Sequence, residues 1–213
     1  MARRFAGDIF GRMKPVVLIL ALAGAGVLGC VAPSVLQYQR RAGIDVNDQV
    51  EYYEIRGKTL RELRIDAHIN GPVARDTTWF GLTHYQIHWT YGYYRQPTLC
   101  RLTNVKMMVD VIVTLPRWVD SSDVDPAAVY WWANSSEQVR THEAHHVQLA
   151  VDGASEIRSL LMRKTGSDCS LLARTANEEA AVILRRVAEQ QQSFDRESRH
   201  GTVLPARAGR SER

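Results

Sequence analysis

The segment of residues 138–161 constrains the fold most, because it combines a helical apolar pattern with the motif His-Glu-x-x-His. Apolar side chains recur there every three or four residues, which is typical of a helix with one buried face. In such a helix, His142 and His146 lie about one turn apart and about 40° apart around the axis. Both imidazoles can then reach one ion at the roughly 2.0–2.1 Å of zinc–nitrogen bonds. Glu143 lies about 100° from His142, so it can serve as general base on a metal-activated water without being a ligand.

The alternative is an amphipathic helix whose histidines face solvent. However, His142 and His146 share one side of the predicted helix with Leu149 and Gly153. Polar groups that point inward need partners, and a metal ion supplies them. We therefore predict a zinc site in this helix. His145 is a candidate to stabilise a developing oxyanion, and an ordinary helix-surface histidine is the alternative at that position.

A second long helix is predicted to bring back the third ligand. Helices over residues 142–163 and 171–194 would have nearly equal lengths, and their short connection makes them antiparallel neighbours. The end of the second helix then lies beside His142, and Asp195 and His200 follow there. We predict His200 as the third zinc ligand, with Asp195 either orienting a ligand imidazole or acting as the alternative ligand.

Asp152 is a further alternative ligand. It stands where the third ligand falls in the longer metzincin pattern His-Glu-x-x-His-x-x-Gly-x-x-His. Leu149 occupies the glycine position at which that chain turns. Without the turn the helix continues and carries Asp152 away from the two histidines around the axis.

Strict alternation of apolar and polar side chains predicts two strands, over residues 83–94 and 105–115. Residues 51–56 have strand composition, and Thr59 is a typical cap for a short helix that follows. We therefore expect an α+β fold, in which a small, mostly antiparallel sheet packs against two long antiparallel helices. The His-Glu-x-x-His motif lies on the first of these helices.

The dipeptide Asp125-Pro126 is a typical helix start. The helix that begins there either continues into the metal motif or is replaced by one that restarts at Ser135 or Ser136.

The first 36 residues differ in composition from the rest of the chain. The opening carries four basic residues and one acid, and residues 15–36 carry no charge, which is the pattern of an export signal. Val27-Leu28-Gly29-Cys30 resembles the lipobox of bacterial lipoproteins, in which the cysteine is lipidated, although Leu28 is larger than usual. The alternatives are a plain cleaved signal and a retained membrane anchor, since 22 uncharged residues are long enough to span a bilayer. Each alternative places the bulk of the chain in the cell envelope, outside the cytoplasm.

The remaining chain divides into three parts by composition. We expect residues 37–50 to be a polar tether, residues 51–201 to form the folded, zinc-dependent peptidase-like domain, and residues 202–213 to be a disordered tail.

The basic character of the chain comes mainly from its N-terminal segment. The whole chain has a formal net charge of +4, and removing residues 1–29 with their four basic and one acidic residues leaves +1. The isoelectric point near 9.1 is therefore a targeting feature and gives no reason to expect nucleic-acid binding.

Three cysteines are present, and Cys30 belongs to the export segment. Cys100 and Cys169 remain as one pair, which we expect to form a disulfide in an oxidising compartment. Such a bridge contributes roughly 4 kcal/mol by constraining the unfolded chain. The alternative is two unrelated buried thiols.

These features together resemble a family of bacterial predicted secreted zinc-dependent proteases, over nearly all of the exported part of the chain. The residues that carry the resemblance are Tyr53, Gly57, Glu62-Leu63, Gly71-Pro72, Trp89, Cys100, Leu115-Pro116-Arg117-Trp118, His142 to His146, Cys169, Phe194-Asp195 and Ser198 to Gly201. The family commonly has threonine where Ser198 stands. The resemblance implies zinc-dependent peptidase activity outside the cytoplasm, and it strengthens His200 and Asp195 as site residues.

We therefore expect hydrolysis of a peptide or protein substrate by a zinc-activated water, with Glu143 moving the proton to the leaving amine. One alternative is a non-catalytic envelope protein with a structural metal site, in which a fourth ligand closes the coordination sphere. Another is an amidase that acts on cell-wall peptides, which uses the same metal chemistry.

Overall fold

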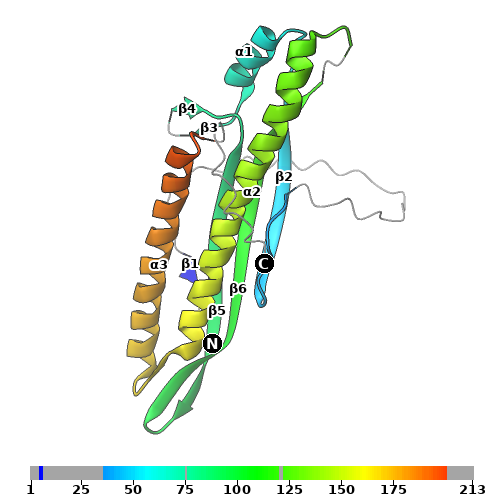
Figure 1. Ribbon diagram of the computed structural model, residues 1–213. Coiled ribbons are helices and arrows are strands. Elements are labelled where there is room, and N and C mark those ends of the chain that lie inside the picture. The colour runs from blue at the N-terminus through cyan, green and yellow to red at the C-terminus, as the bar shows by residue number, and fades with distance from the viewer. Residues whose placement is uncertain (1–4, 7–35, 75, 120–121, 201–213) are drawn as a thin grey trace, which may run out of the picture.

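A long antiparallel hairpin of two strands forms the centre of the sheet (Figure 1). The computed structural model describes residues 5–6, 36–74, 76–119 and 122–200. The strands are β1 (Phe5–Ala6), β2 (Ile44–Ile55), β3 (Val73–Ala74), β4 (Thr77–Thr78), β5 (Leu82–Gln96), β6 (Leu99–Trp118) and β7 (Thr165–Gly166). The helices are α1 (Leu60–Asn70), α2 (Pro126–Arg163) and α3 (Cys169–Glu197).

The main sheet has the strand order β1-β5-β6-β2, with β7 paired to the start of β6, while β3 and β4 form a separate two-stranded sheet. The predicted α+β fold, with two long antiparallel helices against a small sheet, is confirmed. The sheet is mixed, however, because β2 pairs in parallel with β6 along its whole length. The β5–β6 hairpin reverses the chain once, so β6 returns in the direction that β2 had taken.

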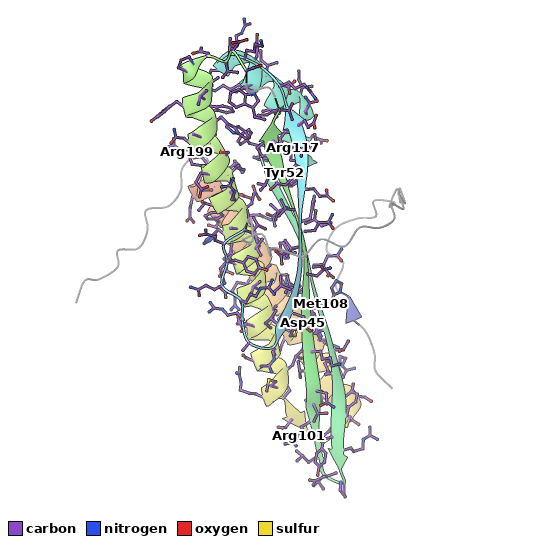
Figure 2. The ribbon with its side chains drawn as sticks, turned by 90° about the vertical axis from the view of Figure 1, so that its right-hand side faces the viewer. Asp45, Tyr52, Arg101, Met108, Arg117 and Arg199 are labelled. Atoms are coloured by element: carbon purple, nitrogen blue, oxygen red, sulfur yellow. A yellow bond between two sulfur atoms is a disulfide. The ribbon has the colours of Figure 1, made fainter. Side chains whose placement is uncertain are left out.

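Strand β2 corrects the expectation that residues 37–50 are a tether. The strand begins at Ile44, and its first half alternates between inward-facing apolar residues and exposed polar ones such as Asp45 and Asn47. Asp45 pairs with Met108 of β6, and both side chains are exposed on the outer face of the sheet (Figure 2). The polar composition therefore belongs to a strand with one solvated face, which charge content alone does not distinguish from a linker.

The segment just before β2 is also fixed to the fold. Leu36 is buried in the main core. The backbone N–H of Gln39 donates to the side chain of Gln148 on α2 at 2.6 Å, and Arg41 forms an ion pair with Asp152 at 2.7 Å. This segment therefore runs along α2 rather than hanging free.

The helix ends follow their sequence signals. Thr59 and Glu62 form a capping box at the start of α1, and Asp125 caps α2 with Pro126 in its first turn. Helix α2 then runs unbroken through the polar stretch before the motif. Asn134 and Ser136 bond back to backbone carbonyls of the preceding turn, so they are accommodated within the helix.

Helices α2 and α3 pack closely over one face of the sheet (Figure 1). A Cβ atom added at Gly153 of α2 would lie 2.4 Å from a methyl carbon of Val187, so only glycine allows the two helices to approach this closely. Cys100 and Cys169 form the predicted disulfide, with Cα atoms 5.4 Å apart. The bridge joins the start of β6 to the start of α3.

Within the described residues, no helix has both the length and the apolar character needed to cross a bilayer. Two expected segments lie outside the described residues. They are the export segment up to residue 35, which includes Cys30 and of which only residues 5–6 are described, and the tail over residues 202–213.

Candidate metal centre

Three side chains from α2 and α3 converge where the C-terminal end of α3 lies beside the middle of α2 (Figure 1). The Nε2 atoms of His142 and His146 are 3.0 Å apart. Asp195 Oδ1 lies 3.2 Å from the first and 2.9 Å from the second. Ligand atoms on a zinc tetrahedron with bonds of about 2.0–2.1 Å are about 3.3 Å apart, so this triangle has nearly the dimensions that a metal ion requires.

Each imidazole is oriented by an acceptor on its other nitrogen. The hydroxyl of Ser198 donates to the carbonyl of Phe194 at 2.7 Å, so its oxygen accepts from Nδ1–H of His142 at 3.2 Å. The side-chain amide of Gln191 donates to the backbone carbonyl of His146 at 3.0 Å, which turns its oxygen toward His146 Nδ1. Both rings therefore direct Nε2 at the shared point, an arrangement typical of metal-binding histidines.

Phe194 forms the floor beneath the histidines. Its ring stacks on His142 with centroids 4.7 Å apart and meets the edge of His146 at 5.2 Å. Phe194 is buried. The two imidazoles are thus held by packing as well as by hydrogen bonds.

Glu143 is buried beside this cluster and is held from β5. The hydroxyl of Thr83 donates to Glu143 Oε2 at 2.7 Å. On the other side, a Cβ added at Gly81 would lie 2.8 Å from Oε1, so residue 81 must lack a side chain. Burial raises the pKa of Glu143, and the nearby charges of His146 and His142 oppose that rise.

The carboxylate of Asp195 is the acid partner of both histidines. Burial alone would raise the pKa of Asp195, but hydrogen bonds from His142 and His146 outweigh it and hold that pKa well below its usual range. For His146, burial acts to lower the pKa, and the bond to Asp195 with the charge of Glu143 reverses the effect and raises it. Metal ligands must be deprotonated, so an ion that bound these side chains would displace the proton that His146 holds.

A family model described as "Bacterial protein of unknown function (DUF922)" matches residues 50–201. The chain belongs to this family. The DUF922 match covers the motif helix, both cysteines of the disulfide and Asp195, while the family description assigns no activity. Comparisons with curated proteins and with solved structures gave no match.

Within the DUF922 domain, the cluster contains Asp195 where we expected His200. His200 lies next to it, with Nδ1 3.8 Å from Asp195 Oδ1. Its ring packs on Trp79 at 4.1 Å between centroids, and its side chain is 44% exposed. Arg199 and His200 both have left-handed backbone conformations, which turn the chain back after α3 and carry His200 to the rim of the cluster.

Asp152 and His145 lie away from the converging ligand atoms. Asp152 pairs with Arg41 and accepts from Gln148 at 3.0 Å, which corrects its standing as an alternative ligand. His145 is exposed, and its ring packs on Phe194 at 4.0 Å. Neither contributes a ligand atom to the cluster.

Three residues that contact the side chains of the candidate site were not predicted to do so: Thr83, Gln191 and Ser198. Gln191 carried a signal, because it is a polar residue in the apolar stripe of the second long helix. Thr83 lies on the inward-facing side of its strand, where a hydroxyl needs a partner. Ser198 was conspicuous only through the family resemblance.

Proposed function

We propose that this chain is an exported zinc metallopeptidase in which His142, His146 and Asp195 bind the metal and Glu143 is the general base. The observation that carries the proposal is the triangle of ligand atoms, no side longer than 3.2 Å, with both Nδ1 atoms bonded to acceptors. Two histidines and one carboxylate, with a position left for water, are a donor set of catalytic zinc sites.

Zinc bound there would act as a Lewis acid that polarises the scissile carbonyl and makes water more acidic. The protein supplies the proton transfer. Glu143 takes a proton from the attacking water and passes it to the leaving amine. Thr83 and Gly81 fix the direction in which its carboxylate points. The exposed side of the site is that of Asp195 and His200, so substrate would approach from there.

His200 is a second candidate for the third ligand, since its Nδ1 atom lies 3.8 Å from Asp195 Oδ1, next to the cluster. The two assignments differ in metal content. Asp195→Ala should lose zinc if Asp195 is the ligand, whereas His200→Ala should retain most of it. The reverse result would assign the metal to His200 and leave Asp195 as its orienting partner.

The experiment that tests the function compares the purified full-length chain with Glu143→Gln and His142→Ala. Zinc is measured by mass spectrometry, and hydrolysis is measured on denatured casein and on peptidoglycan peptides, because cell-wall peptides contain the same amide bond. We expect Glu143→Gln to keep zinc and lose turnover by 100-fold or more, within the range for loss of a general base. His142→Ala should lose both.

A structural metal site is the alternative that the position of His200 favours, because a fourth ligand would close the coordination sphere. In that case Glu143→Gln would alter neither zinc content nor stability, and the wild-type chain would hydrolyse none of the substrates. His142→Ala would then lower the thermal stability without any loss of activity to measure.

Export is supported by the Cys100–Cys169 disulfide, since such bridges persist in oxidising compartments. We propose that the N-terminal segment carries the protein into the cell envelope and tethers it to the membrane, by lipidation of Cys30 or as an anchor. Cell fractionation of the wild type and of Cys30→Ala separates these two routes. A lipid anchor predicts release of the variant from membranes, and a spanning anchor predicts no change.

A further inference from the structure

Arg158 occupies a position on the buried face of α2 where the helical pattern calls for an apolar side chain. Val147, Val151 and Ala154 form this stripe at intervals of four and three residues, Leu161 follows seven residues later, and all four are fully buried. Arg158 continues the same spacing and is partly buried. A cation in such a stripe is uncommon unless it is paired.

The guanidinium of Arg158 has no counter-charge within the part of the chain that the structure describes. Its Nε atom is buried there without any hydrogen-bond acceptor. A buried N–H without an acceptor loses its hydration and gains nothing in return. Such a donor in a native fold indicates a bound water or ion as its partner.

A bulge in the sheet opens space opposite this arginine. The pairing of Thr90 with Lys106 is followed by that of Gly92 with Thr103, so β6 contains one residue more than β5 over this stretch. Asn104 lies in the bulge with φ of 51°, a left-handed conformation that asparagine tolerates better than most residues. The bulge interrupts the ladder and bends β6 locally.

A cavity of about 240 Å³ lies between the bulge and α2, lined by Leu102, Thr103, Asn104, Val105, Arg158 and Met162. Arg158, Thr103 and Asn104 supply hydrogen-bond donors, and no carboxylate lines the space. Gly43 covers the guanidinium from a third side, since a Cβ there would lie 2.6 Å from Arg158 Nε. Gly43 also has φ of +74°, a conformation that favours glycine.

We propose that this cavity binds a small oxyanion, a carboxylate or phosphate group, through the guanidinium of Arg158 with the hydroxyl of Thr103 and the amide of Asn104. A planar guanidinium matches the two oxygens of such a group. Arg158 is twelve residues beyond His146, or about 18 Å along the helix, so this anion site is separate from the metal centre. The inference does not depend on the proposed peptidase activity.

The test is titration of the full-length chain with sodium phosphate and, separately, sodium acetate at constant ionic strength, followed by calorimetry and by thermal unfolding. We expect saturable binding in the calorimeter and a Tm that rises with the logarithm of the anion concentration above Kd. Arg158→Met should weaken binding at least tenfold. Arg185→Met, the same change at an exposed position on α3, should bind as the wild type does.

The titration is repeated on His142→Ala, so that an anion bound to metal is distinguished from one bound at Arg158. Saturation with acetate alone identifies a carboxylate site, and saturation with phosphate alone identifies a phosphate site. The proposal is overturned if neither anion saturates, which would leave a water on Nε, or if Arg158→Met binds as tightly as Arg185→Met.

Discussion

The inward face of α2 contains two groups of polar side chains, and they differ in how completely their hydrogen-bonding atoms are paired. At the metal centre, both imidazole Nδ1 atoms and the carboxylate of Glu143 have partners from α3 or β5. About 18 Å further along the same helix, Arg158 Nε has none among the described residues. In the first group, every one of these hydrogen-bonding atoms has a partner, and only the point where the three ligand atoms converge is left for a ligand. In the second, Arg158 Nε–H lacks an acceptor.

This difference separates two ways of placing polar groups in a core. A cluster whose members hold one another in place is preorganised, so an ion that binds it gains affinity without ordering the ligands first. A partly buried cation whose buried N–H lacks an acceptor is costly until an anion binds, so the anion itself supplies the missing stabilisation. Mutations should therefore alter ligand binding and stability together at the metal centre, and alter them separately at Arg158.

Among the residues that support the ligands and the general base, the largest effect is expected from Gln191→Leu. The change leaves Nδ1–H of His146 without an acceptor, so zinc affinity should fall about 10–100-fold and unfolding should become easier by about 1–3 kcal/mol. Competition with a metal chelator and urea unfolding measure the two quantities. Gln190→Leu, at an exposed neighbouring position, is the control and should change neither. Unchanged zinc affinity in Gln191→Leu would mean that the orientation of His146 does not depend on this bond.

The pH dependence of the two sites should also differ. Since the pKa of His146 is raised, its ring keeps its second proton up to a higher pH than usual, and zinc must displace that proton. Zinc affinity should therefore fall about tenfold for each proton displaced and each pH unit below that raised pKa, and level off above it. Acetate does not have to displace a proton from Arg158, so acetate binding there should stay constant between about pH 5.5 and 8.5. Zinc affinity that is flat across the same range would contradict the assignment of His146 as a ligand.

A smaller effect is expected from Thr83→Val, which removes the donor to Glu143 Oε2 while keeping the shape of the side chain. Zinc should remain bound, and turnover should fall about tenfold, because the carboxylate loses its fixed direction. Thr83→Ser restores the hydroxyl and should restore turnover. If zinc is lost instead, Thr83 supports the ligands rather than the base.

Helix lengths in the sequence predict which residues meet at the candidate metal centre. Expected helices over residues 142–163 and 171–194, with a short connection, bring the residues after the second back to His142, and Asp195 and His200 are both there. The order of the two was not predictable, because it depends on the left-handed turn at Arg199 and His200 beyond the end of α3. No periodic pattern encodes such a turn.

The first half of β2 and the anion cavity were missed for opposite reasons. Asp45 and Asn47 lie on the polar, exposed face of a strand, and their polar composition alone predicts a tether. Arg158 stands in an apolar stripe and was visible as an exception to it. Its meaning depends on the β6 bulge, and a one-residue difference between paired strands cannot be read from one strand alone.

Gly43→Ala should cost about 1–2 kcal/mol, because the residue is held at positive φ and its new methyl group would meet the guanidinium. A double-mutant cycle with Arg158→Met separates the two causes. In the Arg158→Met background the steric part should shrink, while the backbone part persists. Gly166→Ala, where a Cβ would make only contacts of 3.6 Å or longer, is the control. Equal costs in both backgrounds would show that Gly43 does not press on Arg158.

The smallest change in the free energy of unfolding is expected from Arg158→Met in buffer free of oxyanions. This variant tests most directly whether Arg158 differs from the polar side chains of the candidate metal centre. Methionine is unbranched and apolar, so it completes the stripe of Val151, Ala154 and Leu161 and removes the buried donor that lacks an acceptor. Replacing a partly buried cation whose Nε–H has no acceptor should leave the free energy of unfolding unchanged or raise it by up to about 1 kcal/mol, with zinc content unaffected. Adding phosphate or acetate should then raise the free energy of unfolding of the wild type above that of Arg158→Met. A loss of several kcal/mol in oxyanion-free buffer would show that Arg158 holds the fold together by itself, and the contrast between the two polar groups of α2 would disappear.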